Sequence, residues 1–304
     1  MSAGSPRDDT TARLCMGPQP PRKPACTLPP NATDCHCHVF EAPSRYPIAS
    51  DISYVPAPAP LTEYLRMCEM LGIGRTVQVN ASVYGFDNSI TFDAIARLGL
   101  HRARGVAGIS PDVTSTELER LHAGGFRGAR LSTKVKGYGG TEVIDVIAAK
   151  VKPLGWHVQL HFGESATIAD LESMLMATPS PIVFDHLGCM RGNEAPDARG
   201  FQALLRILKR RDDCWVKISS FSGRSVSGPP LYSDMKGLAQ ALVDARSDRV
   251  VWGTNWPHPN QFAPQETPSD AHLVDVFCEW FPDEAVREQV MAANPALLYG
   301  FSQP

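Results

Sequence analysis

The sequence predicts a single-domain (β/α)8 barrel, mainly because short apolar runs alternate with amphipathic stretches. From residue 32 onward, about eight such pairs of a strand and a helix follow one another. Strands this short and apolar are typical of a buried parallel sheet. Eight units favour a closed barrel over an open doubly wound sheet, and no G-x-G-x-x-G motif follows the first expected strand.

Each expected element comes from its pattern of apolar residues. Strands are expected at residues 32–39, 75–80, 103–109, 127–131, 156–161, 181–186, 214–218 and 249–254. Helices are expected at residues 61–72, 88–99, 114–124, 141–153, 167–177, 198–211, 232–245 and 269–293. We expect the barrel to occupy residues 31–304, with the proline-rich residues 1–30 as an extended or disordered arm laid over it.

Composition narrows the class of protein. A chain of 304 residues, 43% of them hydrophobic, can bury a core without disulfides or metals. Its net charge of -3 gives no electrostatic signature of binding to nucleic acid or to an anionic membrane. No apolar run approaches the ~20 residues that span a bilayer. The first residues lack the apolar segment of a secretory signal, so we expect a cytoplasmic protein that acts on small molecules. Its oligomeric state stays open.

The eight cysteines are scattered along the chain, with no C-x-x-C pair. This spacing predicts small buried thiols in a reducing cytoplasm rather than a disulfide framework.

Polar residues collect where the expected strands end, which is where a barrel carries its chemistry. The first strand ends D-C-H-C-H. Alternation along a strand places His36 and His38 on one face with Asp34, and Cys35 and Cys37 on the other. Two imidazoles at a strand end can hold a metal ion or stabilise an oxyanion.

Further histidines lie at other strand ends. His161 ends the fifth expected strand, His186 ends the sixth, and His258 follows the last. Any one histidine is more often a hydrogen-bonded structural residue. For His36, His38 and His186 together, at equivalent heights in the barrel, we favour a functional role.

Basic residues accompany these histidines. Arginine binds carboxylates through two parallel hydrogen bonds, so a cluster on one face suggests a substrate with one or more carboxylates. Hydroxyl groups after the second strand could add hydrogen bonds. The candidates for substrate binding are Arg127, Arg130, Arg224, Ser82, Tyr84, His161 and His258, and the basic residues Arg191, Lys134 and Lys136 accompany them. A single arginine can also be a solvated or salt-bridged surface residue, which we expect more readily of Arg191 than of Arg130 and Arg224.

Five motifs together resemble the amidohydrolase superfamily. They are D-C-H-C-H-V-F (34–40), G-G-F-R-G-A-R-L (124–131), G-W-H-V (155–158), P-I-V-F-D-H-L-G (181–188) and V-V-W-G-T-N-W-P-H-P-N (250–260). More narrowly, they look like the 2-pyrone-4,6-dicarboxylate lactonase branch and its sugar-lactonase and muconolactone-hydrolase relatives. The similarity runs from about residue 30 to residue 301.

This resemblance implies a hydrolase that opens a carboxylated lactone. In the family, histidines and arginines polarise the carbonyl and hold the carboxylates, while an aspartate after the last strand acts as general base. The superfamily at large implies a zinc ion bound by His36, His38, His161 and His186. The pyrone-dicarboxylate lactonases work without a metal, so the resemblance leaves the zinc ion open.

The sequence departs from the family pattern in three places. Asn255 stands where the catalytic aspartate is expected. His161 replaces a tyrosine of the metal-free lactonases, which restores a metal ligand. Cys189 and Met190 precede Arg191, where the pyrone lactonases place an arginine directly after the glycine. An amide can orient water but cannot accept its proton, and loss of a general base typically costs ~10²–10⁴ in rate.

Asn255 has three explanations. We slightly favour an inactivated variant of the enzyme, because the rest of the site is intact. A divergent enzyme could use another base, such as His258 or a metal-activated water, and a pseudoenzyme could bind the ligand without turnover. From another reaction class, a zinc-dependent decarboxylase of the same superfamily is the alternative.

Overall fold

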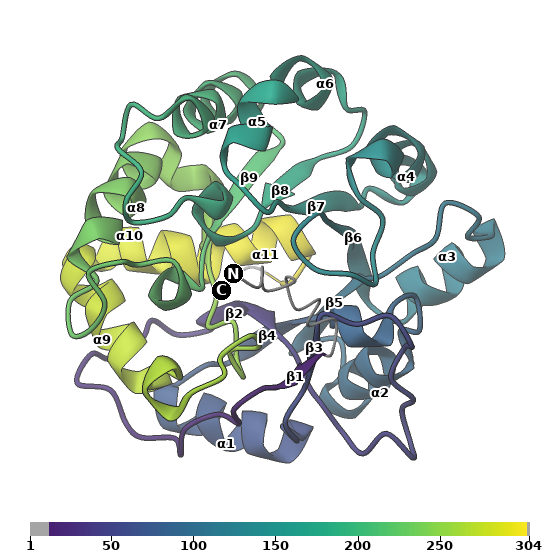
Figure 1. The fold of residues 1–304 in the computed structure, drawn as a ribbon, viewed down its shortest axis with the longest axis horizontal. Coiled ribbons are helices and arrows are strands. Elements are labelled where there is room, and N and C mark those ends of the chain that lie inside the picture. The colour runs from purple at the N-terminus through teal and green to yellow at the C-terminus, as the bar shows by residue number, and fades with distance from the viewer. Residues whose placement is uncertain (1–11, 303–304) are drawn as a thin grey trace, which may run out of the picture.

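Eight parallel strands at the centre of the molecule form a barrel that is surrounded by helices (Figure 1). This computed structural model describes residues 12–302. The expected single-domain (β/α)8 barrel is confirmed. Each strand pairs with the next along the chain, in the order β2 (Thr33–Cys37), β4 (Arg75–Val79), β5 (Ala103–Ala107), β6 (Phe126–Ser132), β7 (His157–His161), β8 (Ile182–Phe184), β9 (Cys214–Ile218) and β10 (Val250–Trp252).

The ring closes where the segment after β10 meets β2. The backbone N–H of His38 donates to the carbonyl of Trp256 at 2.8 Å, and the N–H of Asn255 donates to the carbonyl of His36 at 2.7 Å. Gly253 lies at this seam, and a Cβ atom there would come within 2.7 Å of the backbone nitrogen of His36. The segment that carries Asn255 is therefore fixed directly on the strand that carries both histidines.

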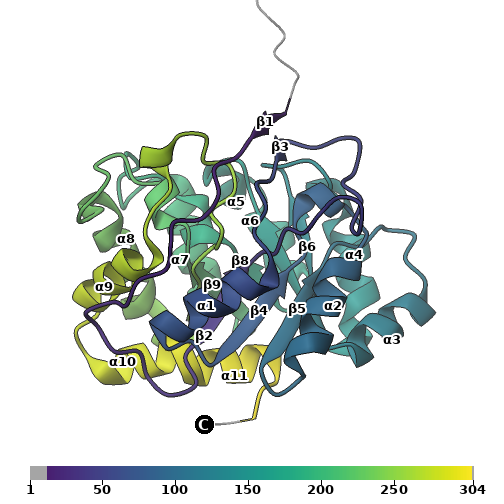
Figure 2. The same cartoon turned by 90° about the horizontal axis from the view of Figure 1, so that it is seen from below.

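Except for α11 (Asn294–Tyr299), which crosses below the centre of the ring, the helices surround the strands (Figure 1, Figure 2). The others are α1 (Leu61–Leu71), α2 (Ser89–Leu98), α3 (Ser115–Ala123), α4 (Ile144–Val151), α5 (Ala166–Asp170), α6 (Glu172–Ala177), α7 (Arg199–Arg210), α8 (Ser233–Arg246), α9 (Asp270–Trp280) and α10 (Glu284–Glu288). Within residues 12–302, none of the helices has the length and apolar character needed to cross a membrane.

Two expected helices are each interrupted. The pattern at 269–293 breaks after α9, because a residue before proline disfavours helical geometry and Phe281, which precedes Pro282, has φ -128° and ψ 76°. The pattern at 167–177 divides into α5 and α6 at Leu171, whose φ of -104° and ψ of 6° depart from helical values.

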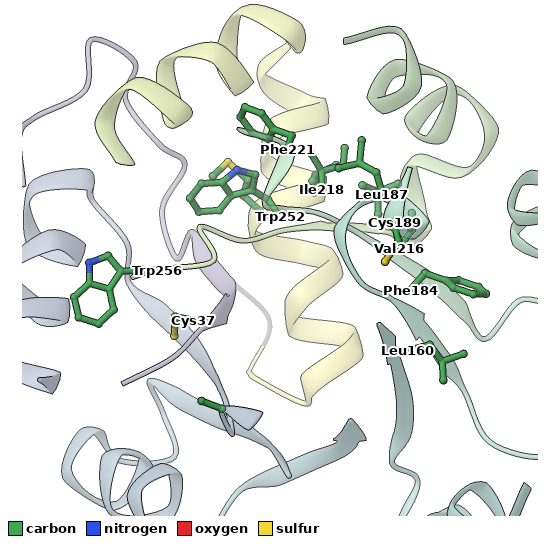
Figure 3. Close-up of a cluster of buried hydrophobic side chains, with 14 of the residues drawn as sticks. Cys37, Leu160, Phe184, Leu187, Cys189, Val216, Ile218, Phe221, Trp252 and Trp256 are labelled. Atoms are coloured by element: carbon green, nitrogen blue, oxygen red, sulfur yellow. The ribbon is translucent and has the colours of Figure 1, made fainter. Parts of the chain in front are cut away.

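The strands separate two apolar layers. Between the strands and the helices lies the larger one, which Figure 3 shows with Leu160, Phe184, Ile218 and Trp252 from four strands. Inside the barrel a smaller cluster comprises Cys35, Val77, Val79, Val106, Val183, Trp215, Val251, Ala296, Tyr299 and Phe301. Helix α11, which supplies Tyr299, lies across the bottom of the barrel in Figure 2. Apolar side chains thus fill the end where the strands begin.

The described part of the N-terminal arm starts at the opposite end of the barrel. Its strand β1 (Arg13–Leu14) pairs in parallel with β3 (Tyr54–Val55). Figure 2 shows both strands above the barrel, with the arm descending past α9 and α1 to the start of β2. The expectation of an extended or disordered conformation for residues 1–11 lies outside the described residues.

A disulfide joins Cys26 of the arm to Cys278 of α9. The backbone N–H of Cys26 also donates to Asp275 at 2.8 Å. The prediction that all cysteines are buried thiols is therefore wrong for this pair, whose members lie 252 residues apart. No local spacing pattern reports a contact between such distant residues. The free, buried cysteines are Cys15, Cys35, Cys37, Cys68, Cys189 and Cys214.

Candidate active site

Strand β2, which carries His36, contains a bulge. Its pairing with β4 shifts register between Asp34 and Cys37, so β2 has one extra residue there. The expectation that the Asp34 side chain shares a face with those of His36 and His38 is wrong, and Cys35 lies inside the barrel and not opposite the histidines. The Asp34 carboxylate instead accepts a hydrogen bond of 2.9 Å from the Tyr64 hydroxyl on α1. Burial raises the pKa of Asp34 to about 6, although its hydrogen bonds oppose this.

Beneath the cavity, His36 belongs to a buried network of charged and polar groups. Its Nδ1 nitrogen lies 3.2 Å from Asp185 Oδ1 and 3.5 Å from Lys217 Nζ. The second carboxylate oxygen of Asp185 accepts hydrogen bonds from Arg130 Nε at 3.0 Å and from Gln159 Nε2 at 3.1 Å. Lys217 also donates to Gln159 Oε1 at 2.6 Å. One carboxylate therefore lies between two cations and an imidazole.

Burial and neighbouring charges set the protonation states in this network. Burial favours the protonated form of Asp185, but the surrounding cationic groups hold its pKa well below the usual range. Burial lowers the pKa of His36 to about 3 against the influence of Asp185, and it lowers the pKa of Lys217 to about 8. At neutral pH, His36 is an uncharged imidazole beside an ionised carboxylate. The His36 Nδ1 nitrogen lies between a carboxylate that can only accept a hydrogen bond and an ammonium that can only donate one.

The other three histidines of the site are also tied through Nδ1. His38 Nδ1 lies 2.8 Å from the carbonyl oxygen of Val79, which can only accept, so this nitrogen carries the proton. The Nδ1 nitrogens of His161 and His186 contact the hydroxyls of Ser132 at 3.2 Å and Ser219 at 2.8 Å. Burial lowers the pKa of all three histidines well below 6.5. The Nε2 nitrogens of His38 and His186 are thus left for a ligand, whereas His161 Nε2 lies 3.4 Å from Arg224 Nη2.

The rings of these histidines form one cluster. The ring centre of His36 lies 5.1 Å from that of His38 and 4.7 Å from that of His186, and His161 lies 5.1 Å from His186. Ligand atoms of His36, Asp185 and His186 lie within 4.8 Å of one another. Within the described residues, the buried Nε2 of His36 has no hydrogen-bond partner.

These residues fit a zinc ion, because zinc-binding histidines usually donate their other N–H to a carboxylate, a carbonyl or water. The expected set of His36, His38, His161 and His186 is only partly gathered. The tightest group pairs His36 and His186 with Asp185, while His38 and His161 lie beside it.

A cavity of about 560 Å³ opens above this cluster. The expected residues that line it are His38, Ser82, Arg130, Lys134, His161, His186, Arg191, Arg224 and Asn255. No aspartate or glutamate is among its described lining residues, whereas five arginines and lysines are. The cavity therefore suits an anionic ligand. A hollow of about 690 Å³ between the arm and α9 is larger, but none of the four clustered histidines lines it.

Asn255 lies at the wall of this cavity. Its φ of 63° is in the left-handed region, which asparagine adopts more readily than most residues. The Nδ2 group donates to Ser220 Oγ at 3.3 Å, and the backbone carbonyl accepts from the His258 N–H at 2.7 Å. The amide is therefore held in place beside the histidines but carries no charge.

A family model described as amidohydrolase matches residues 33–301. This chain belongs to the amidohydrolase family. A 4-sulfomuconolactone hydrolase from Rhizobium radiobacter is 33% identical to it, over 97% of this chain and 99% of that protein. A 2-pyrone-4,6-dicarboxylate hydrolase from Comamonas testosteroni is 32% identical, over 92% and 93%. An apo crystal structure from Agrobacterium tumefaciens matches with a TM-score of 0.83 and 28% identity, over 92% of this chain and all of that one.

Some expected residues of this amidohydrolase do not line the cavity. Arg127 lies at the start of β6, where its guanidinium bonds the carbonyls of His122 and Phe126, so it faces the wrong end of the barrel. His258 Nε2 lies 2.9 Å from Asp270, which keeps it away from the ligand and from the role of base. Tyr84 is buried against Phe40, and Lys136 pairs with Asp51 at 2.6 Å on the surface.

Other residues of the site escaped the sequence analysis. Lys217 interrupts an otherwise apolar strand, C-W-V-K-I, and a lysine in such a run is a signal that could have been used. Asp185 precedes His186 at a strand end, and it could have been noticed there. Arg13 and Phe262 also line the cavity, but nothing in the sequence connects the arm to the loop after β10.

Proposed function

We propose that this amidohydrolase opens lactones that carry carboxylate groups, by adding water to the ester carbonyl. The observation that carries the proposal is the cavity itself, in which neutral imidazoles lie among five cationic side chains and no carboxylate. The relatives named as 4-sulfomuconolactone and 2-pyrone-4,6-dicarboxylate hydrolases support it. Both of those names describe hydrolases of ring esters that bear acidic groups.

The arrangement suits the charges of this reaction. When water attacks the carbonyl carbon, the carbonyl oxygen becomes negative, and the ring oxygen leaves and takes up a proton. Arg224 lines the cavity with a positive charge for the oxyanion or a carboxylate, and Arg130, which is paired with Asp185, can donate its remaining N–H groups. His38 has its Nδ1 proton fixed on Val79, so its Nε2 can accept a proton from water. Asn255 could orient that water through its amide.

Asn255 makes the unaltered chain a slow enzyme under this proposal. His38 substitutes for the missing carboxylate as the proton acceptor. An inactivated variant fits the otherwise complete site, and a pseudoenzyme would bind the same ligands without turnover. His258, an alternative base, is held by Asp270.

A second candidate, a zinc-dependent decarboxylase, is favoured by the ligand atoms of His36, Asp185 and His186. Zinc bound there would act as a Lewis acid that polarises a substrate oxygen. A spectrophotometric screen of carboxylated pyrones and muconolactones, with product analysis, separates the two. Ring-opened acids with no gas release support the lactonase, and release of CO₂ contradicts it. Metal analysis of the purified protein belongs beside this screen.

We propose that the protein is located in the cytoplasm, because of its composition and its free, buried cysteines. Cell fractionation tests it. Finding the protein outside the cytoplasm would contradict this proposal. An oxidising compartment would also suit the Cys26–Cys278 disulfide better.

A further inference from the structure

The N-terminal arm forms part of the wall of the cavity. After β1 pairs with β3, the N–H of Cys15 donates to Val55 and the N–H of Met16 donates to Gln261, both at 2.8 Å. The buried Cys15 thiol in turn accepts from the Asn260 N–H at 3.4 Å. The arm is thereby hydrogen-bonded on one side to β3 and on the other to the loop that follows Asn255.

Arg13 is the arm residue that reaches the cavity. Arg13 and the neighbouring Leu14 are both exposed to solvent, so Arg13 lies at the mouth of the cavity and not in its interior. The Arg13 guanidinium lies 4.4 Å from the ring centre of Phe262, and both residues line the cavity together with His38 and Asn255. The aromatic face holds the guanidinium without neutralising it.

The cations of the cavity fall into two groups. Arg130 is already neutralised by Asp185 at 3.0 Å. Arg224 lies on the other side of the histidines, with Nη1 on the Cys189 carbonyl at 2.9 Å and Nη2 3.4 Å from His161 Nε2. Among residues 12–302, the ion pairs to carboxylates include neither Arg224 nor Arg13. Three guanidiniums, those of Arg13, Arg191 and Arg224, therefore line the same cavity without an ion pair among the described residues, and Arg13 is the one that comes from the arm.

We propose that Arg13 binds a second carboxylate of the substrate, so that the N-terminal arm selects lactones with two carboxylates over lactones with one. This inference rests on the proposed lactonase function and deepens it. Arg224 and its neighbours bind one carboxylate near the histidines, and Arg13 binds the other near the mouth. The arm is then a fixed specificity element rather than a cover.

Calorimetric binding of two stable ring compounds tests the role of Arg13 without any turnover. Isophthalate carries two carboxylates on one ring, and benzoate carries one. We expect Arg13→Met to weaken isophthalate binding about tenfold and to leave benzoate binding within about twofold, because only isophthalate has a second carboxylate that loses its charged hydrogen-bond donor. Arg13→Lys keeps the charge and should restore part of the affinity.

Arg22→Met is the matched control, since Arg22 belongs to the same arm but lines the separate hollow. It removes the same charge and should change neither affinity. Equal isophthalate binding by the Arg13→Met variant and the unaltered chain would overturn the inference, as would an equal loss of benzoate binding. Absence of isophthalate binding to the unaltered chain would overturn it too.

Turnover then separates this inference from the proposed function. If no carboxylated lactone is opened by any variant, the lactonase proposal fails, while the calorimetry still decides what Arg13 binds. If lactones are opened, Arg13→Met should raise KM for a dicarboxylated lactone about tenfold and leave kcat nearly unchanged.

Discussion

The Nδ1 nitrogen of His36 lies 3.2 Å from the Oδ1 oxygen of Asp185, and neither side chain is exposed to solvent. The same carboxylate neutralises Arg130 at 3.0 Å and lies 3.8 Å from the Lys217 ammonium. Asp185 therefore fixes the orientation of one imidazole and the charge of two cations. The site depends on this one carboxylate.

Asp185→Asn should lower the free energy of unfolding by about 3–5 kcal/mol, because it leaves Arg130 and Lys217 buried without a counter-charge. Urea denaturation measures the change. Lys217→Met added to Asp185→Asn should recover part of the loss, since one of the two unpaired cations is then absent. A double variant less stable than Asp185→Asn would contradict this account of the network.

Acid should destabilise the fold between pH 6.5 and about pH 4. Burial lowers the pKa of His36 to about 3 and holds those of His38, His161 and His186 well below 6.5. The unfolded chain therefore binds more protons in this range, and each such histidine lowers the stability by up to about 1.4 kcal/mol per pH unit as the pH falls.

Asp34 works in the opposite direction. Burial raises the pKa of Asp34 in the folded protein to about 6. Its protonation therefore stabilises the fold fully below pH 3.8, and this stabilisation is lost as the pH rises through 6. This effect cancels the pH dependence contributed by only one of the buried histidines. Denaturation at a series of pH values measures the net slope, and His161→Asn should make it shallower. A flat or inverted dependence would show that the histidines are not buried as neutral groups.

The disulfide should stabilise the protein by tying the arm to α9. Cys26→Ser should lower the free energy of unfolding by about 2–4 kcal/mol. Thermal unfolding with and without a reducing agent checks this. The unaltered chain should respond to the reductant, whereas the Cys26→Ser variant should not. If the reductant lowered the unfolding temperature of both proteins equally, its effect would come from another cysteine.

Much of the fold followed from the sequence because most of the barrel strands contain local apolar residues, such as V-V-W at 250–252. The bulge in β2 could not be predicted, since D-C-H-C-H alternates perfectly in sequence and only the pairing with β4 reveals the extra residue. The prediction that Arg127 lines the substrate cavity was wrong for a different reason. Arg127 lies three residues before Arg130, so alternation alone places the two on opposite faces of a regular strand.

The long-range parts of the site were beyond sequence patterns. The contacts of Arg13 with Phe262 and of Cys26 with Cys278 depend on the path of the arm over the barrel. No periodicity encodes that path. The strand-end histidines could be found because barrel topology itself brings strand ends together.

The most direct test of the account is the rate of lactone opening after Asn255→Asp. A carboxylate at this position can accept the proton of the attacking water, so kcat/KM on a carboxylated lactone should rise by about 10²–10⁴. Asn260→Asp is the matched control, because Asn260 also lines the cavity and also has a left-handed backbone, with φ 68°. It should give no increase. No gain with Asn255→Asp, or an equal gain with Asn260→Asp, would contradict the assignment of residue 255 as the position of the general base.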